Sequence, residues 1–163
     1  LALLPGALGY AFMAIVSGRL YDRYGAKLPI MIGLSLMMIG TLCMAILPLS
    51  VANMTLSFMI VQLGAGFWFG NNMTHAVSHV AVAHQNAGNS IFSATNNYSA
   101  AVGIALAAGV LAIFQNQAVD SKAAFVAATR AGTVWMFRLD ILLIVIAGSL
   151  SLWALRVVKQ RAL

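Results

Sequence analysis

The chain has 163 residues, of which 62% are hydrophobic and 7% charged, and its mean hydropathy is +0.94. An ordinary soluble domain carries about 25% charged residues, so this composition excludes a soluble globule with a polar surface. A net charge of +6 does not indicate nucleic-acid binding, because the Lys and Arg residues lie at the ends of apolar runs. The single cysteine, Cys43, excludes an internal disulfide and a cysteine-based metal site.

Five apolar runs are long enough to cross a membrane, which takes about 20 mostly apolar residues. They show no alternation of polar and apolar residues, so they predict helices rather than the strands of a barrel. The sequence therefore predicts an all-α integral membrane protein with five transmembrane helices. The expected spans are residues 3–20, 29–47, 54–79, 90–114 and 134–157.

Short polar or charged segments connect these runs. A charged loop is expected over 18–28, and Asn89 or Ser90 is expected to cap the fourth span. The longest connection, 115–133, is expected to contain a short helix that Asp120 or Ser121 caps and that ends at Gly132.

Basic residues predict the orientation of the chain in the membrane. With five spans, the loop at 18–28, the connection at 80–89 and the C-terminus share one side. That side carries six of the nine basic residues, namely Arg19, Arg23, Lys27, Arg156, Lys159 and Arg161. Lys and Arg accumulate in cytoplasmic loops, so we expect a multi-pass protein of the plasma or inner membrane with a cytoplasmic C-terminus.

Polar side chains within the third and fourth spans are the candidate functional residues. Amides inside a membrane are costly unless they face protein or water. At helical spacing, Trp68, Asn72, His75 and His79 form one stripe with Asn71 beside it. Asn96 and Asn97 belong to a second stripe on the next span. Two interpretations remain open: hydrogen bonds that hold helices together, or a surface lining a substrate cavity.

No catalytic constellation is present in the sequence. Its three acidic residues, Asp22, Asp120 and Asp140, are expected near the membrane faces, so no pair of carboxylates is available for acid–base chemistry. His75 and His79 share a helix face, but no Glu follows the first His as in zinc proteases. We expect no enzyme, cofactor or metal site, and a metal-dependent membrane enzyme built on these two histidines is the alternative.

Residues 18–27 resemble the cytoplasmic loop motif of the major facilitator superfamily, G-x-L-x-D-R-x-G-x-K. The matching positions are Gly18, Leu20, Asp22, Arg23, Gly25 and Lys27. In that family the motif joins the second and third helices of each six-helix half. Four further spans follow it here, so the resemblance implies that residues 1–163 form a partial C-terminal membrane domain. The start at Leu1, without Met, also suggests a fragment of a longer protein.

The segment 62–112 also resembles the fourteen-span drug:proton antiporter branch (EmrB/QacA-like). The glycine pair Gly64 and Gly66, the turn at 87–90, and Gly103 with Ala105 carry this likeness. The resemblance implies alternating access around a midplane site lined by the third and fourth spans. It also implies that Asp22 faces a helix N-terminus in the other half and that Arg23 orients it.

The resemblance thus implies part of a transporter for multidrug efflux by exchange with protons, and hence for drug resistance in a bacterial inner membrane. Its implied partners are the bilayer, the N-terminal helices of the same transporter, a small amphipathic substrate and protons. The proton-coupling residue belongs to the absent helices, so coupling rests on the resemblance alone. A major facilitator transporter for a specific metabolite is the alternative within the same fold.

Overall fold

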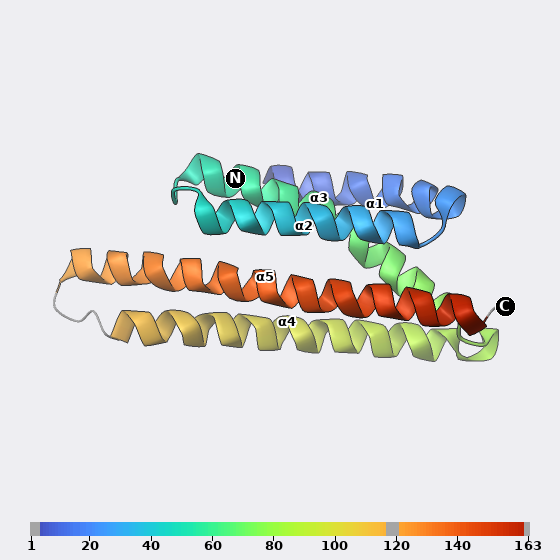
Figure 1. Cartoon of the computed structure of the whole chain (residues 1–163). Coiled ribbons are helices and arrows are strands. Elements are labelled where there is room, and N and C mark those ends of the chain that lie inside the picture. Colours follow the sequence, from blue (N-terminus) through green and yellow to red (C-terminus); the bar gives the residue numbers. More distant parts are fainter. Residues whose placement is uncertain (1–3, 117–120, 162–163) are drawn as a thin grey trace.

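A computed structural model describes residues 4–116 and 121–161, with side chains described as far as Val157. Within these ranges the chain is helical and contains no strand, which confirms the predicted all-α fold. In chain order the elements are α1 (Leu4–Tyr24), α2 (Lys27–Ile46), α3 (Val51–Ser78), the 3-10 turn η1 (Val82–His84), α4 (Gln85–Asn116) and α5 (Lys122–Arg161) (Figure 1).

Helix α3 packs closely against both α1 and α2, because glycines bring the backbones together. A Cβ atom on Gly64 would lie 2.6 Å from the carbonyl oxygen of Gly33 on α2, and one on Gly66 would lie 2.6 Å from that of Tyr10 on α1. The Ser17 hydroxyl, buried on α1, donates a hydrogen bond of 3.2 Å to the Gly66 carbonyl. The first three helices therefore form a tightly packed unit, in which small residues permit close approach as in other membrane helix pairs.

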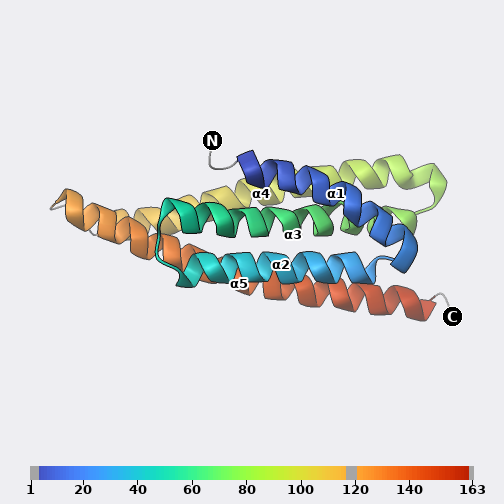
Figure 2. The ribbon, with the colours of Figure 1, turned by 90° about the horizontal axis from the view of Figure 1, so that it is seen from above.

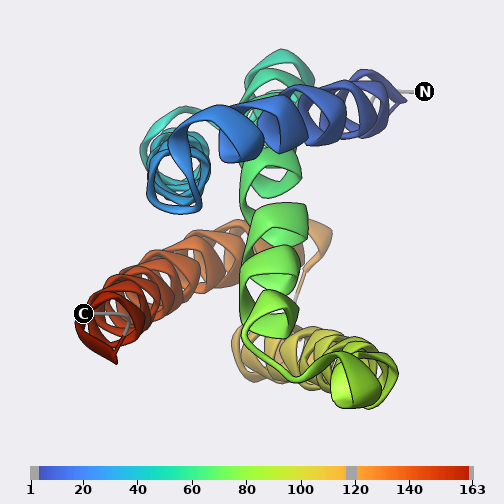
Figure 3. The same ribbon diagram turned by 90° about the vertical axis from the view of Figure 1, so that its right-hand side faces the viewer.

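Helices α4 and α5 form a long antiparallel pair beside this unit (Figure 1). Helix α5 lies along α2, whereas α3 tilts away from α1 and α2 so that its C-terminal part reaches α4 (Figures 2 and 3). No residue of α4 is buried. Most of the α4 surface is thus left uncovered by the described part of the chain.

The connections alternate between the two ends of the bundle, as the predicted topology requires. The α1–α2 turn, η1 and the end of α5 lie at one end, and the α2–α3 connection lies at the other (Figure 1). Four of the described helical segments are long and apolar enough to cross a membrane: residues 27–46, 51–78, 82–116 and 122–157. Helix α1 is long enough but less apolar because its C-terminal turns carry charged residues, so its crossing of the membrane stays a prediction.

Several predicted boundaries are wrong. The segment 18–28 is not a loop, since α1 continues to Tyr24 and α2 begins at Lys27. The fourth helix begins at Gln85, so Asn89 and Ser90 lie within it, and the Ser90 hydroxyl donates to the Asn86 carbonyl instead of capping the helix.

The predicted break at Gly132 is also absent, because α5 is one helix of 40 residues. Ser121 caps it as expected, since its hydroxyl accepts a hydrogen bond of 3.1 Å from the Ala124 backbone N–H. Asp120 lies outside the described residues. Because α5 starts twelve residues before the predicted span at 134, Asp140 lies near the middle of this helix.

Candidate functional site

The loop motif forms the end of α1, a tight turn and the start of α2. Gly25 has φ = +74°, the left-handed conformation that terminates many helices and that favours glycine. Its backbone N–H donates a hydrogen bond of 2.8 Å to the Tyr21 carbonyl, which completes the last turn of α1. Gly18 and Leu20 are helical, so only Gly25 and Ala26 separate the two helices.

The charged side chains of the motif are exposed at this turn. Asp22, Arg23 and Lys27 all project from the described surface. The guanidinium carbon of Arg23 lies 5.5 Å from the centre of the Tyr24 ring, a cation–π distance, so its described contact is with Tyr24. The carboxylate of Asp22 is thus open to a partner from another part of the protein.

Asn71 and Asn72, adjacent in the sequence, have different surroundings on α3. Asn71 is buried, with 4% of its surface exposed, and its amide donates a hydrogen bond of 2.6 Å to the Phe67 carbonyl one turn earlier. Asn72 is only half-buried. Asn71 therefore belongs to the packed side of α3, where its polar group is satisfied by the helix itself.

Trp68 and His75 carry buried polar atoms without a partner among the described residues. These atoms are the indole Nε1 of Trp68 and the imidazole Nε2 of His75. The two residues are seven positions apart, so they lie on the same face of α3 with Asn72 between them. An unpaired buried polar group costs about 1–3 kcal/mol, so this face of α3 requires further hydrogen-bonding partners.

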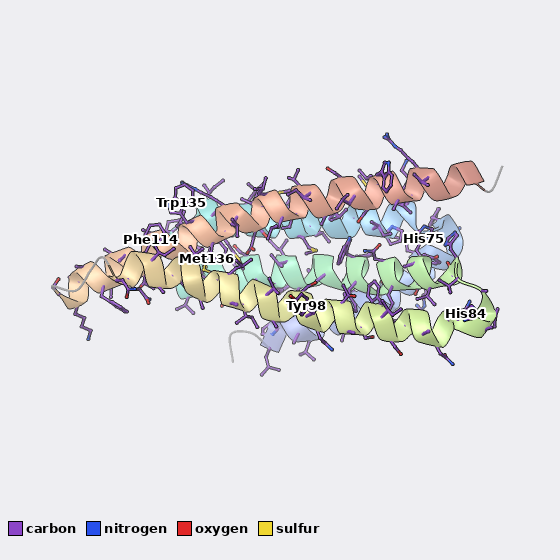
Figure 4. The ribbon with its side chains drawn as sticks, turned by 90° about the horizontal axis from the view of Figure 1, so that it is seen from below. His75, His84, Tyr98, Phe114, Trp135 and Met136 are labelled. Carbon is purple, nitrogen blue, oxygen red and sulfur yellow. The ribbon has the colours of Figure 1, made fainter. Side chains whose placement is uncertain are left out.

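The stripe ends at His79, whose Nδ1 atom has local partners. Its Nδ1 atom lies 2.7 Å from the His75 carbonyl oxygen, and its ring meets the His75 ring edge-on at 4.6 Å. His75 lies near the C-terminal end of α3, and His84 lies in the η1 turn just before α4 (Figure 4). The described residues contain no group of three or more His, Cys, Asp or Glu side chains placed to share a metal ion.

Asn96 and Asn97 lie on the uncovered surface of α4. They do not line the cavity of about 280 Å³ between the end of α3 and the start of α4, and neither do Asn72 or His75. That cavity is mostly apolar, with Val77, Val80 and Phe92 among its lining residues. The structure therefore does not bring the two predicted polar stripes together in a described cavity.

The contact between α3 and α4 is aromatic and was not predicted. The rings of Phe69 and Phe92 meet edge-to-face with their centres 5.7 Å apart. Phe69 follows Trp68 directly in a run of aromatic and glycine residues. Such a run indicates that α3 makes close aromatic contacts, but the sequence alone does not show which ring faces α4.

Comparison with known proteins identifies the family. The sequence model of the Major Facilitator Superfamily matches residues 1–162, essentially the whole chain. The chain belongs to the major facilitator superfamily. No curated protein and no solved structure is significantly similar to it.

Membership of the major facilitator superfamily confirms the coarser part of the sequence prediction. This is a family of membrane transporters, so the chain is a multi-pass membrane protein of transporter type. The match extends over all five helices and includes the motif at the α1–α2 turn. As a member of this superfamily, the protein is of transporter type.

Proposed function

We propose that the protein acts in proton-coupled export of small amphipathic compounds by alternating access. The observation that carries the proposal is the stripe of Trp68, Asn72 and His75 on α3, which holds two buried polar atoms that have no partner among the described residues. In a membrane such atoms need water, substrate or another helix. This stripe therefore supports the proposal that this face of α3 contacts water or substrate near the centre of the transporter.

The mixture of polar and apolar side chains on α4 favours an amphipathic substrate. The uncovered surface of α4 carries amides at Asn96 and Asn97 beside apolar side chains such as Ile104. Binding pockets for small molecules combine mostly apolar walls with a few polar groups. The glycine-rich third helix and small-residue fourth helix, which resemble those of drug:proton antiporters, support export as the direction.

The proposal includes further helices of the same transporter as partners of α4. The uncovered α4 surface and the open carboxylate of Asp22 both accommodate such helices. An acid near a helix N-terminus is stabilised by about 0.3–1 kcal/mol, and more when partly buried, which suits a contact present in only one transport state. The cell or inner membrane is the proposed location, with the C-terminus in the cytoplasm and protons as the coupling ion.

Transport assays on variants of the complete gene product test the role of the stripes. We expect Asn72→Ala, Asn96→Ala and Asn97→Ala to lower dye export roughly two- to tenfold each, the loss of about one hydrogen bond, with unchanged abundance and thermal stability. Asn116→Ala, at the far end of α4, is the matched control. Loss of thermal stability with normal export would instead assign the amides to helix packing.

Transport of a specific polar metabolite is the second candidate. The directional hydrogen-bonding groups of Asn72 and His75 favour it, since a site built from amides and imidazole discriminates against substrates that cannot pair with them. Parallel panels of cationic dyes and polar metabolites separate the two candidates. Export of several unrelated dyes supports the first, and uptake or export of one metabolite alone supports the second.

A further inference from the structure

A groove runs along the contact between α2 and α5. It consists of two cavities of about 430 and 410 Å³, which share Met31 of α2 and Leu152 of α5 in their linings. Because α2 and α5 are antiparallel, the first cavity lies at the start of α2 and the end of α5. The second continues along both helices to Ile39 and Ile144.

The two ends of this groove differ in charge. Among the described residues, Lys27 and Arg156 line the first cavity together with three apolar residues, and none of this lining is acidic. The second cavity is lined mainly by Leu, Ile, Met and Val side chains, and only Ser35 and Ser149 add polar groups. An occupant that matches this groove is therefore negatively charged at one end and apolar along the rest.

The backbone adds to the positive potential at the charged end. Lys27 is the first residue of α2, and Ala26 at the N-cap position supplies no side-chain hydrogen bond to the first turn. The N-terminus of a helix carries a partial positive charge and unpaired N–H groups, which favour anions. The α2 N-terminus thus reinforces the two cationic side chains.

The length of the groove matches one leaflet of a bilayer. From Lys27 to Ile39 the helix rises by about 18 Å, at about 1.5 Å per residue. Half of a hydrocarbon core about 30 Å thick is about 15 Å. Lys27 at the start of α2 and Arg156 near the end of α5 belong to the end of the chain's topology that carries six of the nine basic residues. The predicted orientation places this end at the anionic cytoplasmic leaflet.

We propose that the groove between α2 and α5 binds an anionic membrane phospholipid. Its phosphate lies between the side chains of Lys27 and Arg156, and an acyl chain follows the apolar groove past Met31 and Leu152. The site is separate from the polar stripe on α3, so its occupancy does not depend on which substrate the protein transports. The bound lipid fills space between α2 and α5 that the described side chains leave open.

Native mass spectrometry of the complete gene product tests the proposal. Purified protein is titrated with phosphatidylglycerol and, separately, with zwitterionic phosphatidylethanolamine of the same acyl chains. We expect tighter binding of phosphatidylglycerol, and a loss of about fivefold in its affinity for Arg156→Gln, the factor for one cation near an anionic surface. Arg138→Gln removes one cation from the same helix outside the groove and is expected to leave the affinity unchanged.

A second variant separates charge from shape. Ser35→Phe keeps both cations but fills the apolar groove, so it is expected to reduce lipid binding while the protein remains folded by thermal melting. Equal binding of both lipids, or equal losses for Arg156→Gln and Arg138→Gln, overturns the proposal. So does efficient disulfide formation between two copies of Ser35→Cys in a background without other cysteines, since a second copy then covers the groove.

Discussion

At the scale of single residues, Gly25 determines where α1 ends. Charged and aromatic residues of the motif, including Asp22 and Arg23, are compatible with a helix, so α1 continues through them. Only the positive φ of Gly25 stops it, and this is the sole positive-φ glycine among the described residues. The motif's second glycine is therefore explained by backbone conformation alone, without reference to transport.

Replacing Gly25 by alanine is expected to destabilise the protein by about 1 kcal/mol, because a side chain in the left-handed conformation costs about 1–2 kcal/mol. Gly18→Ala is the matched control, since a Cβ atom there has nothing within 4 Å and Gly18 lies within a helix. Thermal melting of both variants in detergent measures the difference. A Gly25→Ala protein as stable as Gly18→Ala would contradict the assigned turn.

The candidate site could be predicted only in part at this scale. Periodicity placed Trp68, Asn72 and His75 on one face of α3, and that face carries the Trp68 Nε1 and His75 Nε2 atoms that have no partner among the described residues. Periodicity did not reveal that Asn71, one position away, bonds to its own helix. Whether Asn96 and Asn97 face substrate depends on what covers α4, and a helical pattern carries no information about a covering element.

At the scale of helices, the glycines of α2 and α3 set the distance between their axes. A Cβ atom on Gly33 would lie 2.8 Å from the Gly64 carbonyl oxygen, and the reverse distance is 2.6 Å. Both contacts are with backbone atoms, which cannot rotate away as a flexible side chain would. The two helices would have to separate to accept any larger residue at either position.

We expect Gly64→Ala to destabilise the protein by about 1–3 kcal/mol, the usual cost of overpacking a close interface. Gly70→Ala on the same helix is the control, because a Cβ atom there meets nothing within 4 Å. Replacement of a helical glycine in open space is neutral or mildly stabilising. Equal melting temperatures for the two variants would contradict the close approach of α2 and α3.

Helix α5 shows why boundaries were harder to predict than helices. The glycine at position 132 suggested a helix end, but its small size serves packing instead, since a Cβ atom there would lie 3.3 Å from the Phe114 side chain of α4. The preceding segment, rich in alanine, is itself a good helix former. A glycine that ends a helix and one that admits a neighbouring side chain are identical in a single sequence.

At the scale of the whole molecule, hydrophobic runs predicted most of the fold. The lengths of the apolar runs predicted the number and order of the helices, because each membrane span must satisfy its backbone hydrogen bonds internally. How the helices pack was not predictable in the same way, since it depends on contacts between distant positions such as Ser17 and Gly66. The tilt of α3 away from α1 and α2 is of this kind (Figure 3).

The alternating connections predict which positions share a side of the membrane. Cysteines at Tyr24 and Val82, both exposed at one end of the bundle, are expected to react with a membrane-impermeant maleimide only after permeabilisation of cells. A cysteine at Val51, exposed at the opposite end, is expected to react in intact cells. Labelling of Tyr24→Cys and Val82→Cys from opposite sides would contradict the topology.

The close-packed unit of α1, α2 and α3 bears on how the protein is made. Its closest contacts, between Gly33 and Gly64 and between Tyr10 and Gly66, all fall within the first 78 residues of the chain. Chains fold as they are synthesised, with N-terminal parts first. These three helices can therefore pack in the membrane before α4 leaves the ribosome, and the later α4–α5 hairpin can insert against a surface that already exists.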